Sequence, residues 1–236
     1  MFLLAGCSYV DNPDFPPVAF GDAIYNERRS KIVAMGGAGN QYIAQTIIDN
    51  VNCDTHAVFV LWTGLSRLDV QLPIEMDHEV EKYWHRTYSQ RSVWFHSGGY
   101  GGTWHSITNP KSAYAEHIHS YLETQYKPLD WDYLAGISFT AISGACNLLE
   151  TKGIQYRFGF IYDFFQDYSS DTTSLSGAVS RDHLLLDHIP WEKCISTTPY
   201  EFCRDHNLLD TDEFHPSKQG YRQWWQTVKP EVPFGP

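Results

Sequence analysis

The sequence has no long apolar runs and few basic residues. No apolar stretch in its 236 residues approaches the roughly 20 residues that a membrane-spanning helix requires. Lysine and arginine number 17 against 28 acidic residues, which gives a formal charge of -11. This charge repels the phosphates of nucleic acids and anionic membrane surfaces. We therefore expect a soluble single domain over residues 1–236 without a nucleic-acid or membrane partner, and the composition gives no indication of the oligomeric state.

Closely spaced cysteine pairs are absent as well. The number of cysteines, five, is odd, and no Cys-x-x-Cys occurs. The five are Cys7, Cys53, Cys146, Cys194 and Cys203. This pattern argues against a dense disulfide framework and against a cysteine zinc site, so a reducing compartment fits best.

The amino terminus has no basic, apolar leader. Leu4-Ala5-Gly6-Cys7 resembles the lipobox at which bacterial lipoproteins are cut, but only Met1 to Ala5 precede the glycine, and none of them is basic. A signal peptide needs a basic start and an apolar stretch of roughly 7 to 15 residues. We therefore expect no signal peptide and a chain made in the cytoplasm, with incorporation into a virion left open.

The histidines form no recognisable metal motif. No His-Glu-x-x-His occurs, and His117 and His119 are two apart on a predicted helix, so they point to different sides. His183 and the pair Asp187-His188 lie in a stretch without periodicity. We expect solvated or partly packed histidines, no metal and no cofactor.

Short apolar runs alternate with segments of helical periodicity. We interpret three of the runs as central parallel strands: residues 2–5, 31–35 and 57–62. Residues 40–52 carry apolar side chains at helical spacing. Later segments predict two helices at 112–126 and 129–152, a strand at 154–162 and a last helix from Pro216. This order predicts an α/β fold: a three-layer α/β/α sandwich with a central parallel, flavodoxin-like sheet.

Two stretches, 63–110 and 163–199, show no clear periodicity, and both follow strands at the edge where ligands bind in open α/β sheets. We expect the first to form loops near the site. Its candidate substrate-binding residues are Thr63, Trp94, Tyr100 and Trp104, with Phe95 among the same aromatics. A surface insertion that packs its own aromatic rings explains the pattern equally well.

Ser8 follows the first predicted strand directly, which places its hydroxyl at the carboxyl edge of the sheet. Near the other end of the chain, Asp212 stands three residues before His215, ahead of the last helix. A serine hydroxyl becomes a good nucleophile when an imidazole takes its proton, and a carboxylate on the far ring nitrogen orients that imidazole. Ser8, Asp212 and His215 are therefore the candidate catalytic residues. For Asp212, the alternative is a surface turn in which it caps the last helix.

The loop Gly36-Gly37-Ala38-Gly39-Asn40 opens the first predicted helix, so its N–H groups can face a developing negative charge. It lacks the Gly-Lys-Ser/Thr ending of a P-loop and the third glycine of a dinucleotide fingerprint. Cys7 is an alternative nucleophile, but neighbouring residues on a strand point to opposite faces and Ser8 fits better. No Gly-x-Ser-x-Gly occurs, which argues against an α/β-hydrolase elbow.

Three blocks in this order make the chain resemble the SGNH, or GDSL-like, family of serine hydrolases. Gly6-Cys7-Ser8-Tyr9 is similar to the nucleophile block, and Gly36 to Asn40 is similar to the second block. Asp212-x-x-His215-Pro216, followed by Gly220, is similar to the closing block. The resemblance implies a Ser8-His215-Asp212 triad and an oxyanion hole formed by the N–H groups of Ser8 and Gly39.

The third block departs from the family pattern Gly-x-Asn-Asp. The chain reads Gly64-Leu65-Ser66-Arg67, so Ser66 stands where the family has its oxyanion asparagine. Three alternatives are open. The Ser66 hydroxyl takes the place of the asparagine amide, Thr63 or another residue supplies the donor, or the oxyanion hole is incomplete. Losing one such donor typically lowers turnover by about 10² to 10³.

The resemblance implies a serine esterase that forms an acyl-enzyme. Aromatic rings in the 63–110 insertion favour an ester on a carbohydrate, such as an O-acetyl group, because ring faces stack on sugars. The alternative is a weakly active or inactive relative that binds rather than cleaves, for instance in a bacteriophage or cell-surface assembly.

Overall fold

A four-stranded parallel sheet forms the centre of the molecule. The structure, a computed structural model, describes residues 1–11, 30–65, 67–73, 86–88, 92–100, 103–105, 131–165 and 179–232. The strands of the central sheet are β1 (Phe2–Gly6), β2 (Ser30–Ala34), β3 (Ala57–Trp62) and β8 (Gln155–Phe160). They lie in the order β2-β1-β3-β8, and every neighbouring pair is parallel. Every residue of β1 and β3 is buried, which explains why these strands are apolar throughout rather than alternating.

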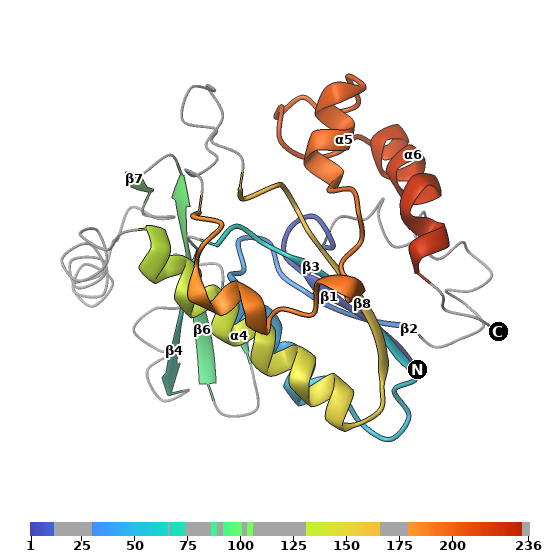
Figure 1. Ribbon diagram of the computed structural model, residues 1–236. Coiled ribbons are helices and arrows are strands. Elements are labelled where there is room, and N and C mark those ends of the chain that lie inside the picture. Colours follow the sequence, from blue (N-terminus) through green and yellow to red (C-terminus); the bar gives the residue numbers. More distant parts are fainter. Residues whose placement is uncertain are drawn as a thin grey trace.

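Helices cover both faces of this sheet. Helices α2 (Asn40–Asn50) and α4 (Trp131–Thr151) pack against each other, and α2 also contacts β1 and β2. Figure 1 shows α4 on one side of the sheet, and α5 (Pro199–Asp205) and α6 (Lys218–Val228) on the other. On that second side the Trp225 ring of α6 lies 5.7 Å from the Phe59 ring of β3. The predicted three-layer α/β/α sandwich is therefore confirmed.

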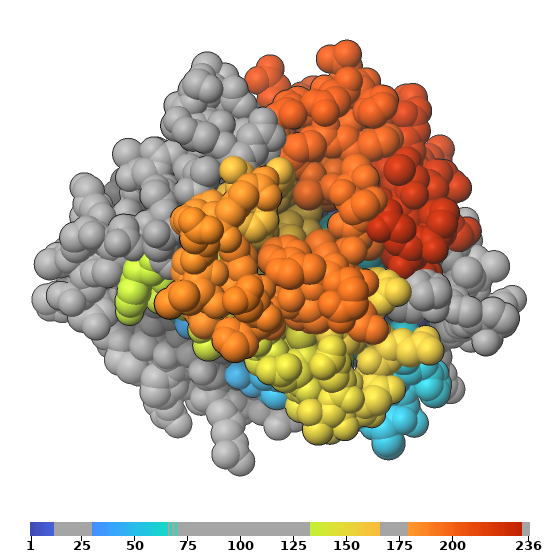
Figure 2. Space-filling model, in the orientation of Figure 1, coloured from blue at the N-terminus to red at the C-terminus, as the bar shows by residue number. Residues whose placement is uncertain are grey.

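Three short 3₁₀ helices complete the described fold. They are η2 (Leu184–His188), η3 (Trp191–Lys193) and η4 (Lys229–Glu231). The segment that holds η2 and η3 lies over the outside of α4, as Figure 2 shows. It buries Leu186 and Ile189, so α4 is covered on both sides. None of the described helices is long and apolar enough to cross a membrane.

Helix ends follow local signals in the sequence. Gly153, the predicted end of the second of the two helices, has a φ of 65° that suits glycine, and α4 stops at Thr151 just before it. The last helix begins at Lys218, two residues after the predicted start at Pro216, because the Ser217 hydroxyl accepts a hydrogen bond from the Gly220 N–H and caps it. The predicted helix at 112–126 lies outside the described residues.

A second, antiparallel sheet lies where the sequence suggested loops. Its strands are β4 (Leu68–Pro73), β5 (Arg86–Tyr88), β6 (Ser92–Tyr100) and β7 (Thr103–His105), with β6 pairing each of the other three. Val93, Trp94 and Phe95 are good strand formers, but polar and apolar residues do not alternate along β6 and glycines interrupt it. The sequence pattern therefore did not predict β6.

The order of the central strands determines where a site can form. From β1 the chain moves to β2 on one side, then crosses back to β3 on the other, so the carboxyl ends of β1 and β3 flank a topological switch point. Ligands bind at such points in open parallel sheets. Ser8 follows β1, and Thr63 follows β3, so both predicted site residues lie at this edge.

Candidate active site

Ser8 lies in a tight turn that ends β1. The N–H groups of Val10 and Asp11 donate to the Cys7 carbonyl at 3.0 and 2.9 Å, which reverses the chain. The side chains on either side, Cys7 and Tyr9, are fully buried, whereas Ser8 is partly exposed. Of the neighbouring Ser8 and Cys7, it is therefore Ser8 that reaches the solvent-facing edge of the sheet.

Ser8, His215 and Asp212 form one hydrogen-bonded chain. His215 Nε2 lies 2.8 Å from Ser8 Oγ, across 207 residues of sequence. His215 Nδ1 lies 2.5 Å from Asp212 Oδ2. When Nδ1 carries the ring proton and donates it to the carboxylate, Nε2 is an acceptor for the serine hydroxyl. This is the arrangement in which an imidazole can take the proton of Ser8.

The turn that carries Asp212 also fixes its charge. Asp212 Oδ1 accepts the backbone N–H groups of His215 and Phe214 at 2.8 and 3.0 Å, while Oδ2 accepts from the His215 ring. Partial burial raises the pKa of the Asp212 carboxyl, but these hydrogen bonds and the electrostatic interaction with His215 outweigh it and lower the pKa below its ordinary value. Asp212 therefore stays ionised beside His215.

Aromatic side chains hold the histidine loop against β1. The Tyr9 hydroxyl donates to the Phe214 carbonyl at 2.6 Å, and the Tyr9 ring lies 5.0 Å from the His215 ring. In turn, the Tyr221 hydroxyl of α6 donates to the Tyr9 carbonyl at 3.0 Å. Sequence reasoning did not assign a role to Tyr9 or Tyr221. The only available signal was that Tyr9 is adjacent to Ser8.

Gly39 lies at the amino end of α2, as expected, but its N–H is already bonded. It donates to Asp69 Oδ1 at 2.8 Å, and the Tyr42 N–H donates to Asp69 Oδ2 at 2.6 Å. The buried Asp69 carboxylate thus satisfies two free N–H groups of the helix end. In this arrangement the Gly39 N–H does not face an open site, which differs from the expected oxyanion donor. Ser66 lies outside the described residues.

Two further contacts join the segment after β3 to the loop after β2. The Asn40 amide accepts from the Thr63 N–H at 2.9 Å and donates to the Thr63 carbonyl at 3.2 Å. The Arg67 guanidinium donates to the Ala38 carbonyl at 3.3 Å. Thr63 Oγ1 is buried and has no hydrogen-bond partner among the described residues. The sequence suggested Thr63 as a donor and placed Asn40 in the second block, but it predicted no role for the side chains of Asp69, Asn40 and Arg67.

The aromatic candidates lie on the second sheet. Trp94 and Tyr100 belong to β6, and Trp104 belongs to β7, where it pairs with Gly99. Their side chains lie outside the described part of the structure. Their assignment to substrate binding therefore stays a prediction.

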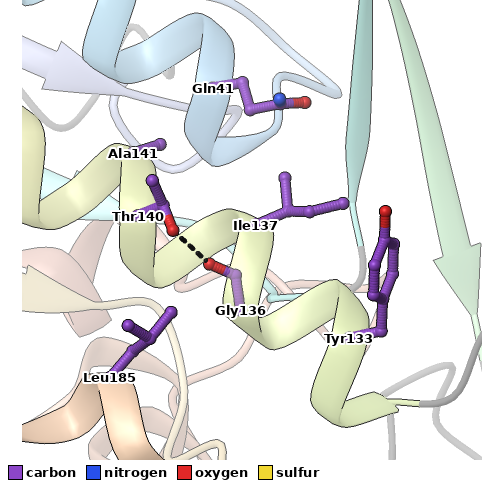
Figure 3. A pocket seen from close by; sticks show the side chains of 7 residues that line it. All are labelled: Gln41, Tyr133, Gly136, Ile137, Thr140, Ala141 and Leu185. Atoms are coloured by element: carbon purple, nitrogen blue, oxygen red, sulfur yellow. Dashed lines mark hydrogen bonds between the residues drawn. The ribbon is translucent and has the colours of Figure 1, made fainter.

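A separate hollow lies along α4 and is also lined from α2 and η2; Figure 3 shows the residues that line it. It has a volume of about 650 Å³ and is lined by Gln41, Tyr133, Gly136, Ile137, Thr140, Ala141 and Leu185. Most of this lining is apolar, and Thr140 turns its hydroxyl back to the Gly136 carbonyl at 2.8 Å. Neither Ser8 nor His215 lines it, so the hydrogen-bonded chain and this hollow are distinct features.

Of the histidines considered as metal ligands, His183 has other partners. His183 Nδ1 accepts from the Leu185 N–H at 3.2 Å, and its ring packs 5.2 Å from that of Phe139. Asp187 and His188 are exposed on η2. Within the described ranges no group of three His, Cys, Asp or Glu side chains could hold a metal ion. His117 and His119 lie outside these ranges.

Comparisons with known proteins give a structural likeness only. No family model and no curated protein matches the sequence. The fold is similar to the crystal structure of the lipase Lip_vut3 from goat rumen metagenome, with 12% sequence identity and a TM-score of 0.45. The match covers 98% of this chain and 96% of that one. A likeness at this level says nothing about the activity of this chain.

Proposed function

We propose that the protein is a serine esterase in which Ser8 is the nucleophile, His215 the general base and Asp212 the group that orients it. The observation that carries this proposal is the unbroken hydrogen-bonded chain from Ser8 Oγ through both nitrogens of His215 to Asp212. Such a chain joins three residue types that acyl transfer needs, at the sheet edge where ligands bind.

The reaction proceeds in two steps. His215 Nε2 takes the Ser8 proton as Ser8 Oγ attacks the ester carbonyl carbon, and the carbonyl oxygen becomes negative. The intermediate collapses, His215 gives its proton to the departing alcohol oxygen, and the acyl group stays on Ser8. A water molecule that His215 deprotonates then attacks the acyl-enzyme, and His215 returns this proton to Ser8 Oγ as the bond to the acyl group breaks and the acid leaves. No cofactor takes part in this scheme.

The three sequence blocks support an SGNH-type enzyme. The nucleophile block follows β1, and the second block follows β2. The closing block lies just before α6. This is the order that the family resemblance implies. For the substrate we propose an ester of a small acyl group on a carbohydrate. Its support is the set of aromatic residues in the 63–110 segment, on β6 and β7.

Ser8→Ala tests the assignment. We expect the hydrolysis of p-nitrophenyl acetate to fall to background, with circular dichroism and the unfolding midpoint unchanged, because Ser8 is a partly exposed turn residue. A fluorophosphonate probe should label the wild-type chain at Ser8 only. Ser196→Ala, at an exposed serine that binds Glu231, is the matched control and should keep full activity. Unchanged turnover in Ser8→Ala would reject the proposal.

A second candidate is a binding module that has lost most of its catalysis. The observation that favours it is the bond between the Gly39 N–H and Asp69, which removes one expected oxyanion donor. Absence of fluorophosphonate labelling in the folded wild-type protein would decide for this candidate. Acetylated oligosaccharides, compared with acyl esters of increasing length, then test the proposed substrate class.

A further inference from the structure

We infer that Arg67 stabilises the oxyanion of the reaction proposed above, in the role that Gly39 and an asparagine would otherwise share. This inference rests on the proposed esterase function. It follows from where the Arg67 side chain lies, from its buried positive charge, and from the bonds that already occupy Gly39.

Arg67 reaches across the carboxyl end of β1. It belongs to the segment after β3, and its guanidinium donates to the carbonyl of Ala38 in the loop after β2. Because β1 lies between β2 and β3 in the sheet, this contact spans the edge at which β1 ends. Ser8 follows β1 at the same edge. The topology therefore brings the guanidinium to the switch point that holds Ser8.

Arg67 forms no direct ion pair with another described residue, and the buried Asp69 carboxylate lies at the N–H end of the same peptide group whose carbonyl accepts from Arg67. Its side chain is 6% exposed, and a guanidinium remains protonated at any working pH. Among the described residues its only side-chain hydrogen bond is the one to the Ala38 carbonyl, and no carboxylate forms an ion pair with it. A buried charge is costly unless a partner of opposite sign is present. The guanidinium therefore stabilises a further negative charge that forms at this edge during the reaction.

The state of the neighbouring donors leaves the oxyanion to Arg67. The Gly39 N–H at the amino end of α2 is bonded to Asp69, so it is not available to a substrate oxygen. Arg67 is anchored one residue earlier in the same loop, at Ala38. The buried Thr63 hydroxyl in the segment after β3 also has no partner among the described residues, which is expected of a polar site that a ligand fills.

The step balances without any other reactant. As Ser8 Oγ bonds to the carbonyl carbon, the π electron pair moves to the carbonyl oxygen, and the Ser8 proton goes to His215. Arg67 N–H groups donate to that oxygen without transferring a proton. When the carbon–oxygen double bond re-forms, the bond to the leaving alcohol breaks and the negative charge near Arg67 disappears. Arg67 therefore binds the transition state more tightly than the ester.

Arg67→Gln tests this role. We expect kcat for p-nitrophenyl acetate to fall by about 10² to 10³, with KM within about threefold of wild type. Phenylboronic acid adds to a catalytic serine as a tetrahedral anion, so its affinity should fall by a similar factor. A merely structural role would not weaken the boronate selectively. Arg157→Gln is the matched control, because Arg157 is a partly buried arginine that binds the Glu231 carbonyl away from Ser8, and it should leave kcat unchanged.

The outcomes separate the two proposals. If Arg67→Gln keeps kcat and boronate affinity within about threefold of wild type while Ser8→Ala is inactive, the Arg67 role is wrong and the esterase proposal stands. If Ser8→Ala is as active as wild type, the esterase proposal itself fails. If Arg67→Gln does not fold, Arg67→Lys decides by the same two measurements. Lysine keeps the charge but lacks the planar donors, so we expect kcat and boronate affinity to fall together.

Discussion

Tyr9 ties the loop that carries His215 to the end of β1. Its hydroxyl is buried and donates to the Phe214 carbonyl, one residue before His215. Burial raises the pKa of Tyr9 well above its ordinary value, so the hydroxyl remains a donor throughout the neutral range. A side chain with no part in proton transfer thus determines where the imidazole lies relative to Ser8.

Tyr9→Phe keeps the ring and removes this donor. The Phe214 carbonyl then loses its partner, and we expect a loss of about 1–2 kcal/mol in the free energy of unfolding, measured in urea. Because the His215 loop loosens, kcat should fall by about tenfold. Tyr156→Phe loses a hydrogen bond to Glu150 away from the site and serves as the control, with kcat preserved. Full activity in Tyr9→Phe would show that the loop does not need this bond.

Site residues that contact near neighbours in the sequence could be predicted from the sequence alone. Asp212 and His215 lie in one turn, so their contact could be predicted from the sequence, and Ser8 was found because it ends an apolar strand. Asp69 and Arg67 were missed because their contacts lie 30 and 29 residues away, at Gly39 and Ala38. No short pattern records such a contact, since it depends on how two loops meet above β1.

Among the elements, α6 depends on a close approach at Gly220. A Cβ atom there would lie 2.5 Å from the Leu208 carbonyl oxygen and 2.8 Å from Cys203 Sγ. The Leu208 oxygen is backbone and also accepts the Ser217 N–H at 2.9 Å, so it cannot move without disturbing the start of the helix. Only glycine lets α6 pack this tightly against the segment after α5.

Gly220→Ala should therefore push α6 outwards. We expect a loss of about 1–3 kcal/mol in the free energy of unfolding and a lower kcat, because Tyr221 of α6 binds Tyr9. Gly144→Ala is the control: this glycine lies within α4 with nothing within 4 Å of its Cβ position. There the substitution should stabilise the protein by about 0.5–1 kcal/mol. If both variants behave alike, the close packing of α6 has no energetic consequence.

The elements themselves were predictable to different degrees. Strands β1 and β3 are buried throughout, β2 is partly buried, and all three contain apolar runs. Helix α4 ends two residues before Gly153, which has a positive φ. The antiparallel strands β4 to β7 were not predicted, because neither β5 nor β7 exceeds three residues and β6 contains two adjacent glycines. Strands of this kind are specified by their partners rather than by their own sequence.

For the whole molecule, the two ends of the chain meet in one site. The Ser8–His215 contact closes a loop of 207 residues, so it exists only when β1, the α5 region and α6 are all in place. Local propensity cannot predict such a contact. The order of short motifs along the chain could suggest it, because a nucleophile block, a glycine loop and an Asp-x-x-His turn all belong to one sheet edge.

Stability of the whole molecule should depend on pH through Glu201. Its carboxyl accepts the Asp163 N–H at 3.0 Å and the Thr198 hydroxyl, and it joins the segment after β8 to the start of α5. Burial raises its pKa to about 7, and the charge of Asp163 adds to this, outweighing the hydrogen bond from Asp163 and the positive charge of Arg204. The unfolded chain releases this proton near pH 4.5. Between these values the folded state binds the extra proton, so a rise in pH favours unfolding.

Glu201→Gln removes this titration while keeping an oxygen acceptor for the Asp163 N–H. Near pH 4.5 the wild type and the variant should have similar free energies of unfolding, because the wild-type side chain is then neutral in the folded state. At pH 8 the wild type carries the full cost of a buried carboxylate, and the variant should be more stable by about 2–3 kcal/mol. Urea unfolding at both pH values measures the difference, and Glu192→Gln, at an exposed carboxylate on η3, corrects for the loss of one negative charge. A gap between wild type and Glu201→Gln that is equal at the two pH values would mean that Glu201 ionises normally in the folded protein.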